Sequence, residues 1–275
     1  MREKGGRGGF TKCWLALREP YDTRARNPDV LSAAVEALAG RAPISIVDLG
    51  CGIGATLRAL SPRLPRKQNW RLVDNNVEAL DGVQTNAAPP GIEVKTVLLD
   101  LVDELEAALE GPTDMVTISA FLDLVSLTWL EQLVWRVAAR DLPVYAALTY
   151  NGRVMLRPID QHDAAVITAV NRHQLGDKGF GPALGPNAST CAMRLFAAAG
   201  YDVLPGPSDW TFGPVDQEIQ LEIFTAWAEA ARETGDVANA DLALWLGARR
   251  DAVAAGRSQL RIGHVDFIAR PVASR

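Results

Sequence analysis

The chain has 275 residues, of which 48% are hydrophobic, so it can build a large core and is not disordered throughout. Its net charge of −5 at pH 7 argues against a nucleic acid or an anionic membrane as partner. Three widely spaced cysteines without a C-x-x-C pair give neither a disulfide framework nor a zinc site. No apolar run is long enough for a membrane span or a signal peptide, so a cytoplasmic protein is expected.

The predicted elements start with a helix at Pro28, which Asn27 can cap and Gly40 can end. Short apolar runs and helical patterns then alternate along the chain. Strands are expected at residues 44–48, 70–74, 92–100, 115–121 and 142–150, and helices at 55–60, 77–83, 101–109 and 127–137. Such alternation is typical of an α/β fold, a mostly parallel sheet with helices on both faces.

After Tyr150 this alternation ends. The expected elements are a short strand at 153–158, a helix at 161–174, a glycine- and proline-rich loop at 175–188, a helix at 189–199, a strand at 201–204, a helical pair over 215–255 and a strand at 260–269. The last strand is apolar on both faces, as expected for a strand inside a sheet.

No repeat or low-complexity linker divides the chain, so we expect a single domain over residues 1–275. Its expected parts are an N-terminal helical lid segment at 1–40, a cofactor-binding core at 41–150, a substrate-side insertion at 151–188, and a C-terminal part of the sheet at 189–275 with a helical insertion at 215–256.

Two cofactor classes compete for the glycine-rich loop DLGCGIGA at residues 48–55. Its spacing satisfies both the dinucleotide fingerprint G-x-G-x-x-G/A and the D-x-G-x-G-x-G loop of methyltransferases, so the glycines alone do not choose. Asp74, about 20 residues further on at the end of a strand, suits the ribose of either cofactor. An NAD(P)-dependent oxidoreductase that binds pyrophosphate in this loop therefore stays open.

The order of the elements resembles the class I S-adenosylmethionine-dependent methyltransferases. A capped helix precedes the glycine loop, strand–helix units run from it, and the chain closes with two more strands around a helical excursion. The resemblance covers residues 27–150 and, more loosely, 187–204 and 259–270. It implies a mostly parallel sheet of about seven strands with an antiparallel last strand. It also implies an enzyme that uses S-adenosylmethionine and releases S-adenosylhomocysteine.

The resemblance assigns cofactor contacts residue by residue, most of them at the carboxyl ends of parallel strands, where open α/β sheets bind ligands. The loop glycines would let the backbone approach the methionine part of the cofactor. Asp74 would accept the ribose hydroxyls and Asp100 the adenine amino group. In the N-terminal segment, which holds Arg18 and Arg24, an arginine would pair with the cofactor's carboxylate. The contacts implied are Asp48, Gly50, Cys51, Gly52, Gly54, Asp74, Asn75, Asp100, Leu101, Ser119, Phe121 and Arg24.

Methyl transfer needs above all a nucleophile held at the methyl carbon, and a base only where that nucleophile must first lose a proton. His162 and His173 fall on one face of the expected helix, about 20° apart. With Tyr150 they are the candidates for a base or for substrate positioning, although both histidines also fit structural roles. Their spacing is too long for a metal pair on one helix, so no metal site is expected.

The insertion offers further candidate contacts to a substrate. Its glycine-rich loop could close as a lid, with Lys178 meeting an anionic group, or it could be a plain surface connection. The residues that leave the fifth strand face the same crevice. The predicted substrate contacts are Asn151, Arg153, Lys178 and Phe180.

The absence of two known motifs restricts the class of methyl acceptor that the sequence favours. SAFL at 119–122 stands where some N-methyltransferases carry N/D-P-P-Y, and Cys191 lacks the Pro-Cys partner of cytosine C5 chemistry. With the acidic charge, this favours a small-molecule acceptor over a nucleic acid, while O, N, C and S stay open as the methylated atom. A third alternative is a non-catalytic, cofactor-binding partner subunit, in which the helices of Trp227 and Trp245 form a homodimer face.

Overall fold

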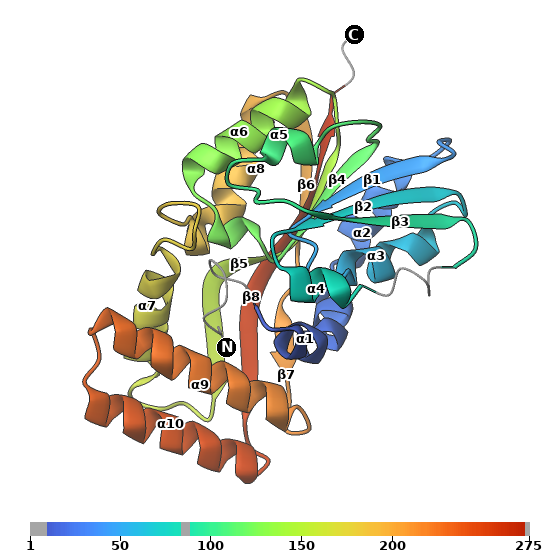
Figure 1. Ribbon diagram of the computed structural model, residues 1–275. Coiled ribbons are helices and arrows are strands. Elements are labelled where there is room, and N and C mark those ends of the chain that lie inside the picture. Colours follow the sequence, from blue (N-terminus) through green and yellow to red (C-terminus); the bar gives the residue numbers. More distant parts are fainter. Residues whose placement is uncertain (1–9, 84–88, 273–275) are drawn as a thin grey trace.

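The computed structural model describes residues 10–83 and 89–272, whose arrangement Figure 1 shows. The strands are β1 (Ile44–Leu49), β2 (Gln68–Asp74), β3 (Ile92–Leu98), β4 (Met115–Ser119), β5 (Val144–Arg157), β6 (Tyr201–Pro207), β7 (Trp210–Phe212) and β8 (Gln259–Pro271). The α-helices are α1 (Lys12–Ala25), α2 (Pro28–Glu36), α3 (Ala55–Leu60), α4 (Val77–Asp81), α5 (Leu105–Ala108), α6 (Leu127–Ala138), α7 (Asp163–Gln174), α8 (Ala188–Ala198), α9 (Gln217–Thr234) and α10 (Asn239–Ala254). Short 3-10 helices are η1 (Ser61–Arg63), η3 (Leu122–Leu124) and η4 (Gly185–Asn187).

The strands form one mixed sheet in the order β3-β2-β1-β4-β5-β8-β6, and β7 pairs with β8 beside this path. β1 to β5 pair in parallel, whereas β8 runs antiparallel to β5, β6 and β7. This arrangement confirms the expected α/β fold, with an antiparallel last strand inserted into a mostly parallel sheet.

Helices cover both faces of the sheet (Figure 1), because the side chains of a strand alternate between its two faces. In β1, Ile44 and Ile46 belong to the core that also contains α2 and α3. Val47 and Leu49 belong to the opposite core, which contains α5, α6 and α8. None of the helices in the described ranges is long and apolar enough to cross a membrane.

Several local predictions are confirmed at the level of single residues. Oδ1 of Asn27 accepts the backbone N–H groups of Asp29 and Val30, each at 3.1 Å, and so caps α2. α3 has the bounds expected from the sequence, Ala55–Leu60. The first nine residues of the predicted lid segment lie outside the described residues.

Some predictions about the elements are wrong. β5 is continuous, whereas the sequence indicates a break after Tyr150 and a separate strand at 153–158. Its register on β8 shifts twice, and φ is 55° at Leu148 and 80° at Gly152, so the bulges break the alternation that predicts a strand. The helix expected at 101–109 shrinks to α5, and β7 is too short to show a pattern in the sequence.

A second lobe is built on β5 and β8, which run beyond the parallel strands (Figure 1). β7 pairs with β8 there, α1 packs against β7, and α9 packs between α7 and α10. Trp245 is fully buried and its Nε1 donates to Oδ1 of Asp163 at 2.8 Å, while Trp227 packs half-buried against the same core. Trp245 therefore holds the lobe together and offers no surface to a partner subunit.

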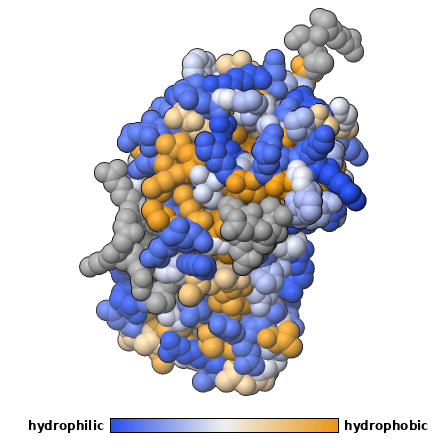
Figure 2. All heavy atoms as spheres, turned by 45° about the vertical axis from the view of Figure 1, so that its right-hand side comes forward, coloured by the Kyte–Doolittle hydropathy of each residue, from blue (hydrophilic) through white to orange (hydrophobic). Residues whose placement is uncertain are grey.

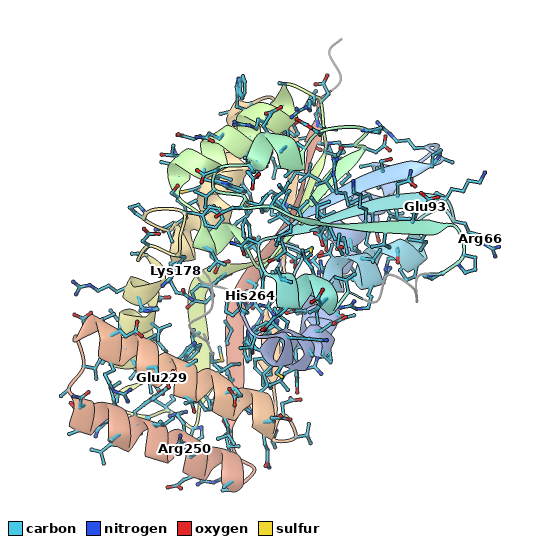
Figure 3. All side chains as sticks on the ribbon, in the orientation of Figure 1. Arg66, Glu93, Lys178, Glu229, Arg250 and His264 are labelled. Atoms are coloured by element: carbon cyan, nitrogen blue, oxygen red, sulfur yellow. The ribbon has the colours of Figure 1, made fainter. Side chains whose placement is uncertain are left out.

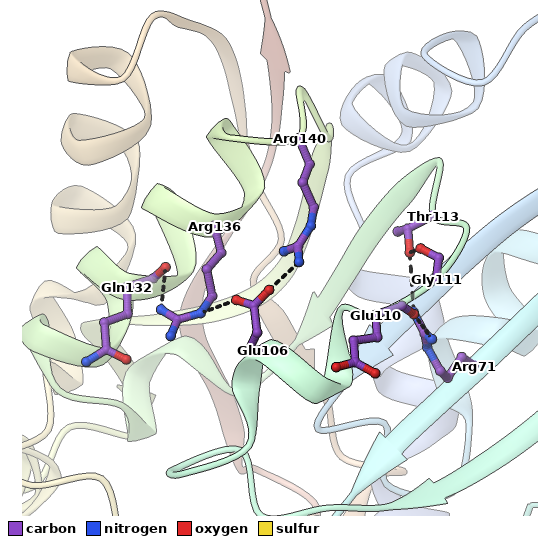
Figure 4. A network of polar contacts seen from close by, with 8 residues as sticks. All are labelled: Arg71, Glu106, Glu110, Gly111, Thr113, Gln132, Arg136 and Arg140. Carbon is purple, nitrogen blue, oxygen red and sulfur yellow. Dashed lines mark hydrogen bonds and ion pairs between the residues drawn. The ribbon is translucent and has the colours of Figure 1, made fainter.

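A polar network on the outside of the sheet joins α5 to α6 and β2 to the turn before β4 (Figure 4). The carboxylate of Glu106 accepts from Nε of Arg136 at 2.9 Å and also pairs with Arg140. Hydrogen bonds from Arg140 and Arg136 hold the pKa of Glu106 below its usual range. Arg71 of β2 donates to the carbonyl of Glu110. The Glu106 pairs are exposed, so their contribution to stability is small.

Candidate active site

The glycine loop between β1 and α3 is kept free of side chains by both conformation and space. The φ angles of Gly50, Gly52 and Gly54 are 65°, 52° and 84°, a region that L side chains rarely adopt. A Cβ at Gly50 would lie 2.6 Å from Cδ2 of Phe121, and one at Gly52 would lie 3.2 Å from Cδ1 of Leu15. The loop therefore presents bare backbone to whatever approaches it.

Asp74, at the end of β2, is tied to this loop. Its Oδ2 accepts the backbone N–H of Gly52 at 2.8 Å, and its Oδ1 accepts the N–H of Asn76 at 2.9 Å. Burial raises the pKa of Asp74, and these backbone hydrogen bonds oppose that shift. Each carboxylate oxygen can accept a second hydrogen bond, so the side chain still has room for two ligand hydroxyls.

A cavity opens at the carboxyl ends of β1, β2 and β4. Figure 2 shows apolar surface in the middle of one face, surrounded by polar residues. The sequence-predicted residues that line the cavity are Gly50, Cys51, Gly52, Asp74, Asn75, Leu101, Ser119, Phe121, Lys178 and Phe180.

Part of the cavity wall is aromatic. The rings of Phe121, Trp129 and Phe180 pack edge to face, with centroids 5.4 to 5.7 Å apart, and the two phenylalanines face the cavity. The loop of Phe180 is held by Asp177, whose Oδ1 accepts two backbone N–H groups of the same loop at 2.7 and 3.0 Å. The predicted lid loop is therefore packed against the wall of the cavity.

Several sequence-predicted cofactor residues lie outside the cavity wall. The side chain of Asp100 is used in the turn that follows β3, where its Oδ1 accepts the N–H of Val102 at 3.0 Å. Arg24 lies against the second lobe, where Nη2 donates to the carbonyl of Thr211 at 3.0 Å. The predicted cofactor residues outside the wall are Asp48, Gly54, Asp100 and Arg24.

Asp48 is buried within the sheet, two residues before the first loop glycine. Its Oδ1 accepts a hydrogen bond from Oγ1 of Thr117 at 2.7 Å. Its Oδ2 is buried without a hydrogen-bond partner among the described residues. Burial raises the pKa of Asp48 to about 7, against the opposing effects of Thr117 and Arg26. The carboxyl therefore lies behind the loop, where its uncharged form is favoured.

Tyr150 and its neighbours on β5 also lie outside the cavity wall. Oη of Tyr150 donates to Oδ1 of Asn171 at 2.7 Å, and burial raises the pKa of the phenol above its usual value. Asn151 and Arg153 are on the bulged part of the strand, where Oδ1 of Asn151 accepts the N–H of Arg153 at 3.1 Å. In the structure these side chains contact other residues of β5 and of α7 in the insertion.

The two candidate histidines stand at opposite ends of α7, and neither lines the cavity. His162 precedes the first residue of the helix, with its ring 3.1 Å from the side-chain amide of Gln161. Nε2 of His173 lies 2.9 Å from Oε2 of Glu233, and its Nδ1 lies 3.3 Å from Nζ of Lys178. His173 therefore reaches the cavity only through Lys178.

The sequence analysis names Arg18 among the arginines of the N-terminal segment, but it does not predict that Arg18 forms an ion pair with Asp22 in the cavity wall. Arg18 and Asp22 of α1 both line the cavity, and Nε of Arg18 donates to Oδ2 of Asp22 at 2.9 Å. Their spacing of four residues on a helix is the signal that could have found them. Arg26 was also missed: it is buried, and its Nη2 donates to Oγ of Ser119 at 3.2 Å. Arg26 thereby positions a hydroxyl in the cavity wall.

These residues fit a nucleoside cofactor with an amino-acid tail. The loop has no room for a Cβ at Gly50, so the backbone itself forms that part of the wall. Asp74 offers acceptors for a diol, and Leu99 and Leu101 offer apolar contacts beside it. Among the described residues, no group of three or more His, Cys, Asp or Glu side chains could hold a metal ion.

Comparison with known proteins gives one family and a set of structures. Residues 46–140 match a family model described as a methyltransferase domain. No curated protein matches the chain. A cyclopropane-fatty-acyl-phospholipid synthase-like protein from Lactobacillus casei is similar over 96% of this chain and 95% of its own, with 15% identity and a TM-score of 0.54. An S-adenosylmethionine-dependent methyltransferase from Thiobacillus denitrificans, in complex with S-adenosylhomocysteine, covers 95% and 99% with 14% identity and a TM-score of 0.44.

The sheet order, the bare glycine loop and the carboxylate at the end of β2 are features of a Rossmann-like fold with a site for a nucleoside cofactor. Residues 46–140 match a methyltransferase domain, which agrees with the resemblance to class I methyltransferases seen in the sequence. This match favours S-adenosylmethionine as the cofactor, with S-adenosylhomocysteine as the product, over the NAD(P) of the oxidoreductase alternative.

Proposed function

We propose that this protein is an S-adenosylmethionine-dependent methyltransferase and acts on a small molecule that binds in the cavity between α1 and the loop at 175–187. One observation carries the proposal: a single cavity is lined both by Gly52 and Asp74, on the cofactor side, and by Lys178 and Phe180 of the insertion. A nucleophile bound at the insertion side would share one enclosed space with the methyl donor. The acidic net charge of the chain supports a small acceptor over a nucleic acid.

When bound, the cofactor would supply a methyl group carried by a sulfonium sulfur. An electron pair of the acceptor forms a bond to the methyl carbon, and the sulfur leaves in line as a neutral thioether. The chain has to hold the acceptor and exclude water. Phe121 and Phe180 supply the apolar part of the wall that does so. Oγ of Ser119, held by Arg26, offers a hydrogen bond at the end of β4.

The candidates for a general base are poorly placed for that role. Tyr150 would have to ionise, yet burial raises its pKa and its Oη already donates to Asn171. His162 and His173 do not line the cavity. We therefore propose that binding and orientation supply most of the catalysis, with Tyr150 and His173 as positioning residues. The homodimer and the cytoplasmic location expected from the sequence stay predictions.

Transfer of a labelled methyl group tests this proposal. The protein is incubated with methyl-labelled S-adenosylmethionine and a cell extract that has been separated into small molecules, protein and RNA. We expect label in the small-molecule fraction, and none with the Gly52→Val variant as control. Label that enters only the protein or the RNA fraction would overturn the proposal of a small acceptor.

A further inference from the structure

Two buried cations line the cavity. Arg18 comes from α1 and Lys178 from the loop after α7, and each is only 8% exposed. Figure 3 labels Lys178 at the junction of the two lobes. Burial raises the pKa of the Asp123 carboxyl to about 6, and the charges of both cations oppose that rise. Burying two cations is unfavourable unless anions accompany them.

Arg18 is held rigidly, with part of its guanidinium left over. Nε and Nη2 donate to the two carboxylate oxygens of Asp22, at 2.9 and 3.4 Å. Asp22 is itself fixed by Nε1 of Trp210 at 2.9 Å, and the guanidinium lies over the Trp210 ring, 5.2 Å from its centroid. Nη1 of Arg18 has no hydrogen-bond partner among the described residues, so it is a positioned donor in the cavity wall.

Lys178 is held from behind by a histidine and a carboxylate. Nζ donates to the carbonyl of His173 at 2.9 Å and lies 3.3 Å from its Nδ1. Nε2 of His173 lies 2.9 Å from Oε2 of Glu233. A carboxylate only accepts, so Nε2 carries the imidazole hydrogen and Nδ1 accepts from the ammonium. These acceptors hold Nζ of Lys178 in place, and its ammonium is a donor that suits an anion in the cavity wall.

The same wall is apolar beside these cations. Phe121, Leu124 and Phe180 line the cavity with Arg18 and Lys178. A ligand that satisfies both kinds of wall has an anionic group joined to an apolar body. Asp123 interacts electrostatically with both cations, but it does not line the cavity.

We infer that the methyl acceptor is a small organic anion, whose carboxylate or phosphate group binds between Arg18 and Lys178 while its apolar part packs on Phe121 and Phe180. The inference rests on the proposed function, because it assumes that the acceptor binds in this cavity. Glu233 and His173 act as positioning residues for Lys178, and Asp22 and Trp210 act in the same way for Arg18.

Binding of simple probes in the presence of S-adenosylhomocysteine tests the inference. The probes are benzoate and phenyl phosphate as anions and benzamide as the neutral analogue of benzoate. We expect an anion to bind wild-type protein at least about tenfold more tightly than benzamide does. Lys178→Met should remove this preference, and the stronger of the two anions shows which group the site prefers. Equal binding of benzoate, phenyl phosphate and benzamide, or no binding of any of them, overturns the inference.

Variants of α1 complete the test. Arg18→Met should also weaken anion binding about tenfold, and Arg18→Lys keeps the charge near Asp22 in case the first variant does not fold. Arg24→Met is the matched control, because Arg24 is on the same helix but outside the cavity wall. If Arg18→Met weakens S-adenosylhomocysteine and leaves benzoate unchanged, Arg18 serves the cofactor and the inference fails. If wild-type protein does not bind S-adenosylhomocysteine, the methyltransferase site itself is in error.

Discussion

Oδ2 of Asp74 accepts a hydrogen bond from the backbone N–H of Gly52 at 2.8 Å. This bond joins the end of β2 to the middle of the glycine loop, so the two features that mark the site for a nucleoside cofactor are one structural unit. The loop gains a fixed shape from the carboxylate, and the carboxylate is fixed in the cavity wall by the loop. A change at either residue should therefore affect cofactor binding more than stability.

Asp74→Ala should weaken binding of S-adenosylhomocysteine by roughly 10- to 100-fold, because the ribose hydroxyls lose a charged acceptor. Calorimetric titration of the two proteins measures the change. Asp81→Ala is the control, since Asp81 is an exposed acid on the neighbouring helix α4. An unchanged affinity in folded Asp74→Ala protein would show that the ribose is bound elsewhere.

Gly52→Val should abolish cofactor binding. The new side chain enters the cavity wall and its Cβ meets Leu15 at 3.2 Å, while φ of 52° adds about 1–2 kcal/mol of strain. Gly235→Val separates the two effects, since Gly235 has φ of 70° but nothing within 4 Å of a Cβ. We expect both variants to unfold at lower urea concentration and only Gly52→Val to lose S-adenosylhomocysteine. Loss of binding in Gly235→Val as well would mean that strain alone destroys the site.

The core of the fold and the cofactor side of the site could be predicted because their signals are local. The glycines and Asn27 act within a turn of their own strand or helix, and Asp74 ends its own strand at a recognisable spacing from the glycine loop, so the sequence shows what they do. The continuous β5 could not be predicted, since positive φ at Leu148 and Gly152 interrupts the alternation of side chains.

The insertion side of the site depends on contacts between distant segments. Arg18 is positioned by Trp210, which lies far from it in the sequence. Lys178 is positioned by His173, which in turn contacts Glu233 of α9. No spacing in the sequence predicts these contacts between distant residues. Arg24 and Arg18 are equivalent candidates in the sequence, and only the packing of α1 places Arg18 in the cavity wall.

Asp48→Asn should stabilise the protein at neutral and alkaline pH. Burial raises the folded-state pKa of Asp48 to about 7, whereas an unfolded aspartate has a pKa of about 3.9. Between these values the folded state holds a proton that the unfolded state has lost, so wild-type stability falls as pH rises through this window. The variant avoids that loss. Its free energy of unfolding should exceed that of the wild type by a further amount of roughly 2–4 kcal/mol above pH 7, relative to the difference below about pH 4.

Urea unfolding of wild-type and Asp48→Asn protein at about pH 5 and about pH 8 measures this difference. The advantage of the variant should grow with pH. Asp29→Asn, an exposed acid in the first turn of α2, is the control and should show no such growth. An advantage that is equal at both pH values would mean that Asp48 is ionised in the folded protein throughout.

Asp123 should couple anion binding to proton uptake. Burial raises the pKa of Asp123 to about 6, and Arg18 and Lys178 hold it from rising further. A ligand anion between those cations adds a second negative charge near Asp123, so the pKa of Asp123 rises when the anion binds. Affinity for benzoate should therefore be highest below about pH 6 and fall as pH rises above that value. Tyr150 and His264 also face this region, but burial raises the pKa of Tyr150 and lowers that of His264 to about 3, so both stay neutral across this range.

Benzoate titrations of wild-type and Asp123→Asn protein between about pH 6 and about pH 8 measure this coupling. The variant should bind benzoate more tightly than wild-type protein at the upper pH, because the competing carboxylate is gone, and its affinity should not change with pH. Benzamide gives the neutral control and should bind both proteins equally at every pH. A benzoate affinity that weakens in Asp123→Asn would show that Asp123 supports the bound anion and does not compete with it.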